Sequence, residues 1–133
     1  AMARIDSALL AQGNELFQTY HGAFAENYAA QQLRAAGVPQ LVYWKTEGKK
    51  AEIDFLYPFD NRVVPFEVKA RINPHGKSMQ SYRDQFSPDL LLRGTLLNLM
   101  RNGDILNLPL YAVNDIERFA RMALGRKNSP PGV

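Results

Sequence analysis

The sequence predicts a mixed α/β domain in which a β-sheet is flanked by helices. Three consecutive extended segments between residues 41 and 72 are joined by short turns, which favours an antiparallel meander. A helical segment then separates the third extended segment from a fourth, and such a strand–helix–strand step predicts a parallel crossover. Hydrophobic residues make up 46% of the 133 residues, so a single domain with a real core can form.

The first predicted element is a long helix from about Asn14 to Ala36. Asn14 is a good N-cap, and Gly37 followed by Pro39 provides the C-terminal stop. Apolar residues follow two sides of this helix, which indicates a position between layers or against a missing partner. The bulky side holds Phe17, Tyr20, Phe24 and Tyr28, and the small side holds Gly22, Glu26, Ala29, Ala30 and Leu33.

The rest of the chain is expected to complete the sheet and its helical layers. The predicted strands are 41–46, 50–57, 62–72, 89–95 and 105–113, the predicted helices are 78–86 and 116–124, and 96–103 stays open between helix and loop. Pro58 to Asn61 reads as a turn between the second and third strands. Pro109 is expected to keep the last strand near a sheet edge, because proline cannot donate to a neighbouring strand.

The ends of the chain are expected to lie outside the domain proper, which is predicted to span 14–124. Residues 1–13 read as a lead-in whose Ala1-Met2 start resembles a cloning scar. Residues 125–133 are expected to be a disordered tail.

The bulk composition narrows the class of protein. Cysteine is absent, which excludes disulfides and thiolate metal sites. No apolar run reaches the ~18 residues of a membrane span and no signal peptide is visible, so a cytoplasmic location is expected. The net charge of +3 permits a polyanionic partner without demanding one.

Charged side chains gather on one face of the second and third predicted strands. Strand alternation puts Glu52 and Asp54 on one face of the second strand. The same alternation puts Ile53, Phe55 and Tyr57 together on its other face.

The third predicted strand supplies a second carboxylate and an amine. Glu67 and Lys69 share one face of it, and the hairpin register can set Asp54 beside Glu67. Two carboxylates this close repel each other unless a cation joins them. Magnesium suits such oxygen ligands and activates water, while an ammonium group neutralises charge on a phosphate. These residue types together therefore suit the hydrolysis of a phosphodiester.

Asp54, twelve residues, then Glu67-Val68-Lys69 resembles the pattern of the PD-(D/E)xK phosphodiesterase superfamily. Ile53 stands where that superfamily usually has a proline. More narrowly, the chain is similar to the C-terminal domain of a family of prokaryotic ATPases of the AAA type. The similar segments are GAFAENYAAQQL (22–33), YWKTEGKKAEIDF (43–55), PFEVKA (65–70), GKSMQSY (76–82) and LPLYAV (108–113).

The resemblance implies a restriction-endonuclease-like fold with an αβββαβ core. It implies that Asp54, Glu67 and the carbonyl of Val68 bind magnesium or manganese, and that Lys69 positions the nucleophilic water. Glu26 would hold a second metal ion or a water on the first. The implied partners are nucleic acid, expected to be DNA, and an ATPase module in the full-length chain.

Basic residues around these segments are candidate contacts to a nucleic-acid backbone, and equally well scattered surface charge. They are Lys45, Lys49, Lys50, Arg71, Lys77 and Arg93.

Two other interpretations of the charged residues stay open. Glu67 and Lys69 could instead belong to a solvated strand face, with Asp54 in a cross-strand ion pair. A non-catalytic module that binds nucleic acid or protein is the alternative function.

Overall fold

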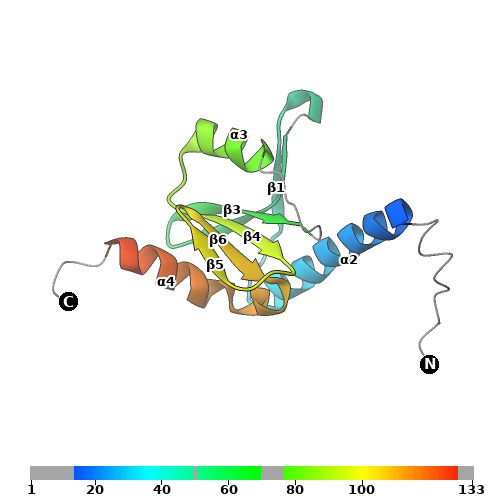
Figure 1. Cartoon of the computed structure of the whole chain (residues 1–133). Coiled ribbons are helices and arrows are strands. Elements are labelled where there is room, and N and C mark those ends of the chain that lie inside the picture. Colours follow the sequence, from blue (N-terminus) through cyan, green and yellow to red (C-terminus); the bar gives the residue numbers. More distant parts are fainter. Residues whose placement is uncertain (1–13, 50, 70–76, 129–133) are drawn as a thin grey trace.

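The computed structural model describes residues 14–49, 51–69 and 77–128, which form a six-stranded mixed sheet with helices on both faces (Figure 1). The predicted α/β class is therefore confirmed. The elements are α2 (Asn14–Ala35), β1 (Val42–Lys45), the 3-10 turn η1 (Glu47–Lys49), β2 (Glu52–Phe59), β3 (Arg62–Val68), α3 (Lys77–Phe86), β4 (Leu91–Thr95), β5 (Met100–Asn102), β6 (Ile105–Pro109), the 3-10 segment η2 (Leu110–Asp115) and α4 (Ile116–Asn128).

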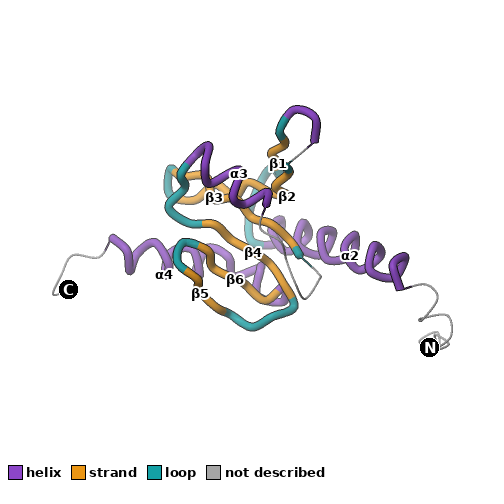
Figure 2. The backbone as a smooth tube through the Cα atoms, turned by 45° about the horizontal axis from the view of Figure 1, so that its top comes forward, coloured by secondary structure: helices purple, strands orange, loops and turns teal. Residues whose placement is uncertain are grey.

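The strands lie in the order β1-β2-β3-β4-β6-β5 (Figure 2). β1, β2 and β3 pair antiparallel, as their short connections predict. β3 and β4 pair parallel across the α3 crossover, which confirms the predicted strand–helix–strand step. β6 then pairs parallel to β4, and β5 pairs antiparallel to β6 at the edge.

The two faces of the sheet carry separate apolar clusters. α2, η2 and α4 cover one face and share the larger cluster with β2, β3, β4 and β6. α3 covers part of the other face, where Met79 and Tyr82 pack against Ile53 and Leu91. No helix in the described part of the chain has the length and apolar character needed to cross a bilayer.

The small side of α2 is the side that packs on the sheet. Ala29 and Leu33 of that side are buried, as is the neighbouring Ala25, because small side chains let the helix axis come close. On the bulky side, Phe24 is 64% exposed and Tyr28 is 40% exposed within this chain. The side chains of 14–21, among them those of the other two predicted aromatic positions, lie outside the described side chains.

The hairpin between β2 and β3 is tighter than predicted. β2 continues through Pro58, and the turn consists of Asp60 and Asn61, with φ of 49° and 64°. Aspartate and asparagine tolerate this left-handed backbone, which two-residue hairpin turns require. β1 pairs with β2 only as far as Leu56, so the missing N–H of Pro58 falls beyond the reach of β1.

β6 lies near a sheet edge, as predicted from Pro109, which is its last residue. Part of the undecided stretch 96–103 forms the edge strand β5 beside it. One prediction for the C-terminal part of the chain was wrong. α4 continues to Asn128, so the predicted disordered tail does not begin at residue 125. Residues 1–13 and 129–133 lie outside the described residues.

Gly94 of β4 lies against the fully buried ring of Phe66. A Cβ there would come within 2.9 Å of ring atoms of Phe66 and 3.2 Å of Leu110 Cδ2. We expect Gly94→Ala to destabilise the domain by about 2 kcal/mol, as overpacking of a core does. Urea unfolding measures this change, and Gly22→Ala is the matched control because its Cβ would meet nothing within 4 Å. Equal stability of Gly94→Ala and the wild type would contradict the packing of Phe66 on β4.

Candidate active site

A β-bulge in β2 lies at the candidate aspartate. Val42 pairs with Leu56 and Trp44 pairs with Ile53, so two steps along β1 match three steps along β2. The extra residue therefore falls within the stretch that contains Asp54. Bulges re-aim side chains and occur often beside active sites.

The bulge overturns one prediction made from strand alternation. Phe55 and Tyr57 pack in the cluster under α2, whereas Ile53 packs with α3 on the opposite face. The predicted shared face of Ile53, Phe55 and Tyr57 was wrong, because strict alternation assumes a strand without an extra residue.

The carboxylate of Asp54 is tied to the neighbouring strand. Phe55 pairs with Phe66 in the β2–β3 ladder. Beyond this pair, at the end of β3, the backbone N–H of Val68 donates a hydrogen bond of 2.8 Å to Asp54 Oδ2. Where the β2–β3 ladder ends, a carboxylate oxygen of Asp54 thus accepts the hydrogen bond from the β3 backbone. This contact holds the Asp54 side chain beside Glu67.

Glu67 is the most deeply buried carboxylate of this site, at 2% exposure. Its Oε1 lies 3.3 Å from Lys69 Nζ, so these two side chains share a face as predicted. Its Oε2 is buried and has no hydrogen-bond partner among the described residues. A buried carboxylate oxygen without a partner is rare and points to a group that would satisfy it, such as a cation.

Both carboxyl groups hold their protons more tightly than usual. The pKa of Asp54 is raised from 3.8 to about 6, chiefly by burial and also by the charges of Glu26 and Glu67, against the lowering effects of the Val68 hydrogen bond and Lys69. Burial also raises the pKa of Glu67, against the Lys69 and Arg93 charges. A divalent cation would favour the ionised forms that burial disfavours.

A pocket of about 360 Å³ opens beside Asp54. Among its lining residues are Glu26 from α2, Lys45 from β1, and Glu52. Lys45 Nζ also lies 5.2 Å from the centre of the Tyr43 ring. The structure therefore brings Glu26 and Lys45, two predicted site residues, to the hollow that Asp54 lines.

The structure describes the other predicted nucleic-acid contacts only in part. Lys77 is the exposed first residue of α3. Lys49 lies in η1, but its side chain is outside the described side chains. Lys50 and Arg71 lie outside the described residues.

The donor set of this site fits magnesium with few protein ligands. Within 14–49, 51–69 and 77–128, no group of three or more His, Cys, Asp or Glu side chains could hold a metal ion. Asp54, Glu67 and the carbonyl of Val68 supply only hard oxygen donors. Magnesium is commonly held by one or two carboxylates and keeps several waters. The unsatisfied Glu67 Oε2 is the observation in favour of that fit.

Arg93, another of the predicted nucleic-acid contacts, lies on β4 beside Glu67, a neighbour that the sequence did not reveal. It is the register partner of Glu67 on the parallel strand β4. Its Nε is buried and has no hydrogen-bond partner among the described residues. The available signal was an arginine inside the strongly apolar stretch DLLLRGT, where a charged residue needs a reason.

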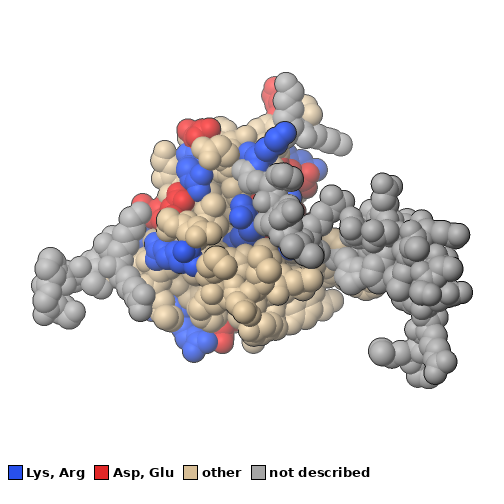
Figure 3. All heavy atoms as spheres, in the orientation of Figure 1, with Lys and Arg blue, Asp and Glu red and all other residues tan. Residues whose placement is uncertain are grey.

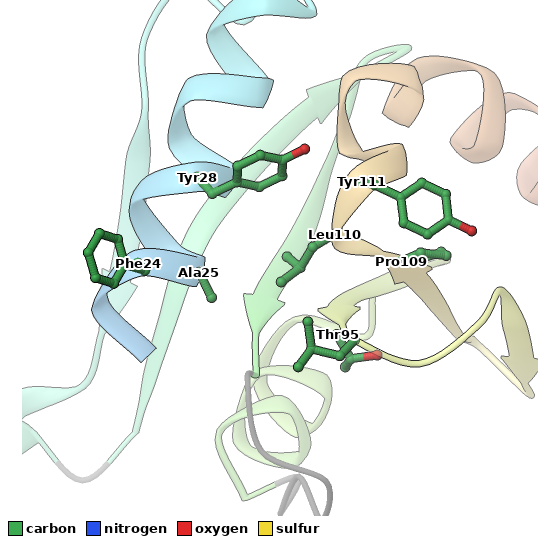
Figure 4. Close-up of a pocket in the computed structure, with 8 residues that line it drawn as sticks. Phe24, Ala25, Tyr28, Thr95, Pro109, Leu110 and Tyr111 are labelled. Atoms are coloured by element: carbon green, nitrogen blue, oxygen red, sulfur yellow. The ribbon is translucent and has the colours of Figure 1, made fainter. Parts of the chain in front are cut away.

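A second pocket, of about 370 Å³, lies between α2 and the ends of β4 and β6 (Figure 4). Its lining is apolar apart from hydroxyl groups, with Phe24, Tyr28, Leu96 and Tyr111 among the residues. The face in Figure 3 likewise shows a broad uncharged area over β5 and β6. None of the predicted site residues lines this pocket, whereas Glu26, Lys45 and Asp54 line the pocket of about 360 Å³.

Comparison with known protein families matches residues 21–111 to a family described as "Domain of unknown function (DUF4143)". The matched residues cover more than half of the chain and include Glu26, Asp54, Glu67 and Lys69. No match was found among curated proteins or among solved structures.

Proposed function

Because the chain belongs to the DUF4143 family, whose description assigns no activity, we propose a function from its own site. The domain is a magnesium-dependent phosphodiester hydrolase of the PD-(D/E)xK type that acts on nucleic acid, expected to be DNA. The observation that carries this proposal is the pair of poorly solvated carboxylates, Asp54 and Glu67, with Lys69 beside them and Glu67 Oε2 unsatisfied.

The roles follow from how each side chain is held. Asp54, Glu67 and the Val68 carbonyl would hold magnesium, which when bound supplies charge that polarises the phosphate and activates water. The Val68 N–H fixes Asp54 in place, so little reorganisation is needed when the substrate arrives.

Lys69 is the group next to the reacting phosphate in this proposal. Glu67 Oε1 holds its ammonium at 3.3 Å, where Lys69 can orient the attacking water and offset charge on the phosphate oxygens. The water oxygen attacks phosphorus, and the bond from phosphorus to the 3′ oxygen breaks. The products are a 5′ phosphate and a 3′ hydroxyl, as the superfamily resemblance implies.

Two basic side chains are candidate contacts to a nucleic-acid backbone. Lys45 lines the pocket that Asp54 and Glu26 share, and Lys77 is exposed at the start of α3. The net charge of +3 agrees with a polyanionic partner.

Nicking of supercoiled plasmid tests the proposal directly. We expect cleavage in magnesium or manganese and none in EDTA. Cleavage that survives Asp54→Ala would come from a contaminating nuclease, and no cleavage in either metal would contradict the proposed activity.

A non-catalytic binding or regulatory module is the second candidate function. The absence of a three-ligand metal group in the described part of the chain favours it. Calorimetric titration with manganese separates the two candidates. Retention of DNA at low salt without metal binding would support the binding module, whereas metal binding supports the hydrolase.

We further propose that the domain works as the C-terminal part of a larger ATPase. The similarity of its segments to such domains is the basis of this proposal. The exposed aromatic side chains Phe24 and Tyr28 support it, since they leave an apolar surface that another module would cover. ATP hydrolysis by the full-length chain, with and without DNA, tests the coupling.

A further inference from the structure

We propose that Arg93 binds a phosphate group of the substrate next to the carboxylate of Glu67. This inference rests on the proposed function and extends it, because it assigns the phosphate-binding group of the site. It adds a β4 residue to a site otherwise built from β1, β2, β3 and α2.

The sheet register places the two side chains together. Glu67 and Arg93 are partners on parallel strands, and partners in register point to the same face of a sheet. The ion-pair partner of Glu67 is nevertheless Lys69, at 3.3 Å.

Glu67 and Arg93 each have one polar atom without a hydrogen-bond partner, an acceptor on Glu67 and a donor on Arg93. Glu67 Oε2 and Arg93 Nε are the buried side-chain nitrogen or oxygen atoms that lack a hydrogen-bond partner in the part of the chain that the structure describes. A carboxylate oxygen in this state accepts a cation, and a guanidinium N–H donates to an anion. A phosphate group bridged to a metal ion satisfies both atoms at once. The planar guanidinium also matches the geometry of phosphate oxygens.

A purely structural role for Arg93 explains these contacts less well. Arg62, Arg83, Arg118 and Arg121 each have a carboxylate oxygen within 4.0 Å, and those oxygens account for their charge. Arg93 lies beside Glu67 without such a contact among the described residues. An arginine kept there only to balance Glu67 would be expected to pair with its free oxygen.

Titration with inorganic phosphate in the presence of magnesium tests the inference without relying on catalysis. In ¹⁵N-labelled wild-type protein, the Nε–H resonance of Arg93 is expected to shift as phosphate is added. Its loss in Arg93→Lys assigns the resonance. Arg93→Lys keeps the charge but loses the fork of donors, so phosphate affinity should fall about tenfold. Arg62→Lys is the matched control and should leave phosphate affinity unchanged.

The outcomes separate this inference from the proposed hydrolase. A shifted resonance and a weaker Arg93→Lys complex support the phosphate site even where the plasmid stays uncut, and in that case only the hydrolase proposal fails. An unmoved resonance in the wild type overturns the Arg93 assignment even where the plasmid is cut. Because that readout uses the wild type, a folding defect in Arg93→Lys would not remove the test.

Discussion

Asp54→Asn is expected to lower kcat/KM for plasmid cleavage by more than about 100-fold. Loss of a group that merely supports a metal ligand costs about 10- to 100-fold, and Asp54 is proposed as a ligand itself. The asparagine keeps the size of the side chain and can still accept the 2.8 Å hydrogen bond from the Val68 N–H. The lost activity would therefore report the missing charge rather than a disturbed strand.

Initial rates of plasmid nicking in magnesium measure this effect. Asp115→Asn makes the same chemical change at an exposed residue that pairs with Arg118, and it should cleave at the wild-type rate. Calorimetry should show manganese binding in Asp115→Asn and much weaker binding in Asp54→Asn. Near-normal cleavage by Asp54→Asn would remove Asp54 from the metal site.

The same substitution is expected to stabilise the metal-free domain at neutral pH by up to about 3 kcal/mol. Burial raises the pKa of Asp54 from 3.8 to about 6. About two pKa units correspond to about 3 kcal/mol between the two protonation states. Above pH 6 the wild-type domain must keep a poorly solvated negative charge, which the asparagine amide does not carry.

The sign of the pH dependence follows from proton linkage. The folded wild type binds the Asp54 proton more tightly than the unfolded chain does, so its stability falls as the pH rises from about 4 to about 6. The stability difference between Asp54→Asn and wild type should be close to zero below about pH 4 and greatest above about pH 6. Urea unfolding in EDTA across this range measures it, with Glu117→Gln, an exposed change, as control. A difference independent of pH would show that Asp54 is not buried as described.

Magnesium should narrow this stability difference at neutral pH. A ligand that binds the folded state alone adds to its stability, and only the wild type would gain. Such a pattern, in which the residue needed for function weakens the unliganded fold, is common at functional sites.

Most of the fold follows from local patterns in the sequence. The limits of α2, the meander of β1 to β3 and the α3 crossover come from caps, turn residues and hydrophobic periodicity, which depend on near neighbours. The short strand β5 does not, because its pairing with Ile105, Leu106 and Asn107 of β6 is a tertiary contact, and its side chains are exposed.

The candidate site could be predicted in part. The shared face of Glu67 and Lys69 follows from alternation in a regular strand, and the structure places them together. The bulge beside Asp54 could not be predicted, because register shifts arise from the pairing of two strands and leave no mark in local composition. The approach of Arg93 to Glu67 likewise depends on the β3–β4 register.

The hydrogen bond from the Val68 N–H to Asp54 also affects how many oxygens of this carboxylate could bind a metal ion. One of the two oxygens of this carboxylate is already engaged by the backbone, which favours single-oxygen coordination over a chelating grip. In the proposed function, a magnesium ion held by single oxygens from two carboxylates and one carbonyl would keep positions for exchangeable solvent and an incoming substrate oxygen. The Val68 hydrogen bond would thus favour an ion that stays open to exchange over one that is caged for structural support.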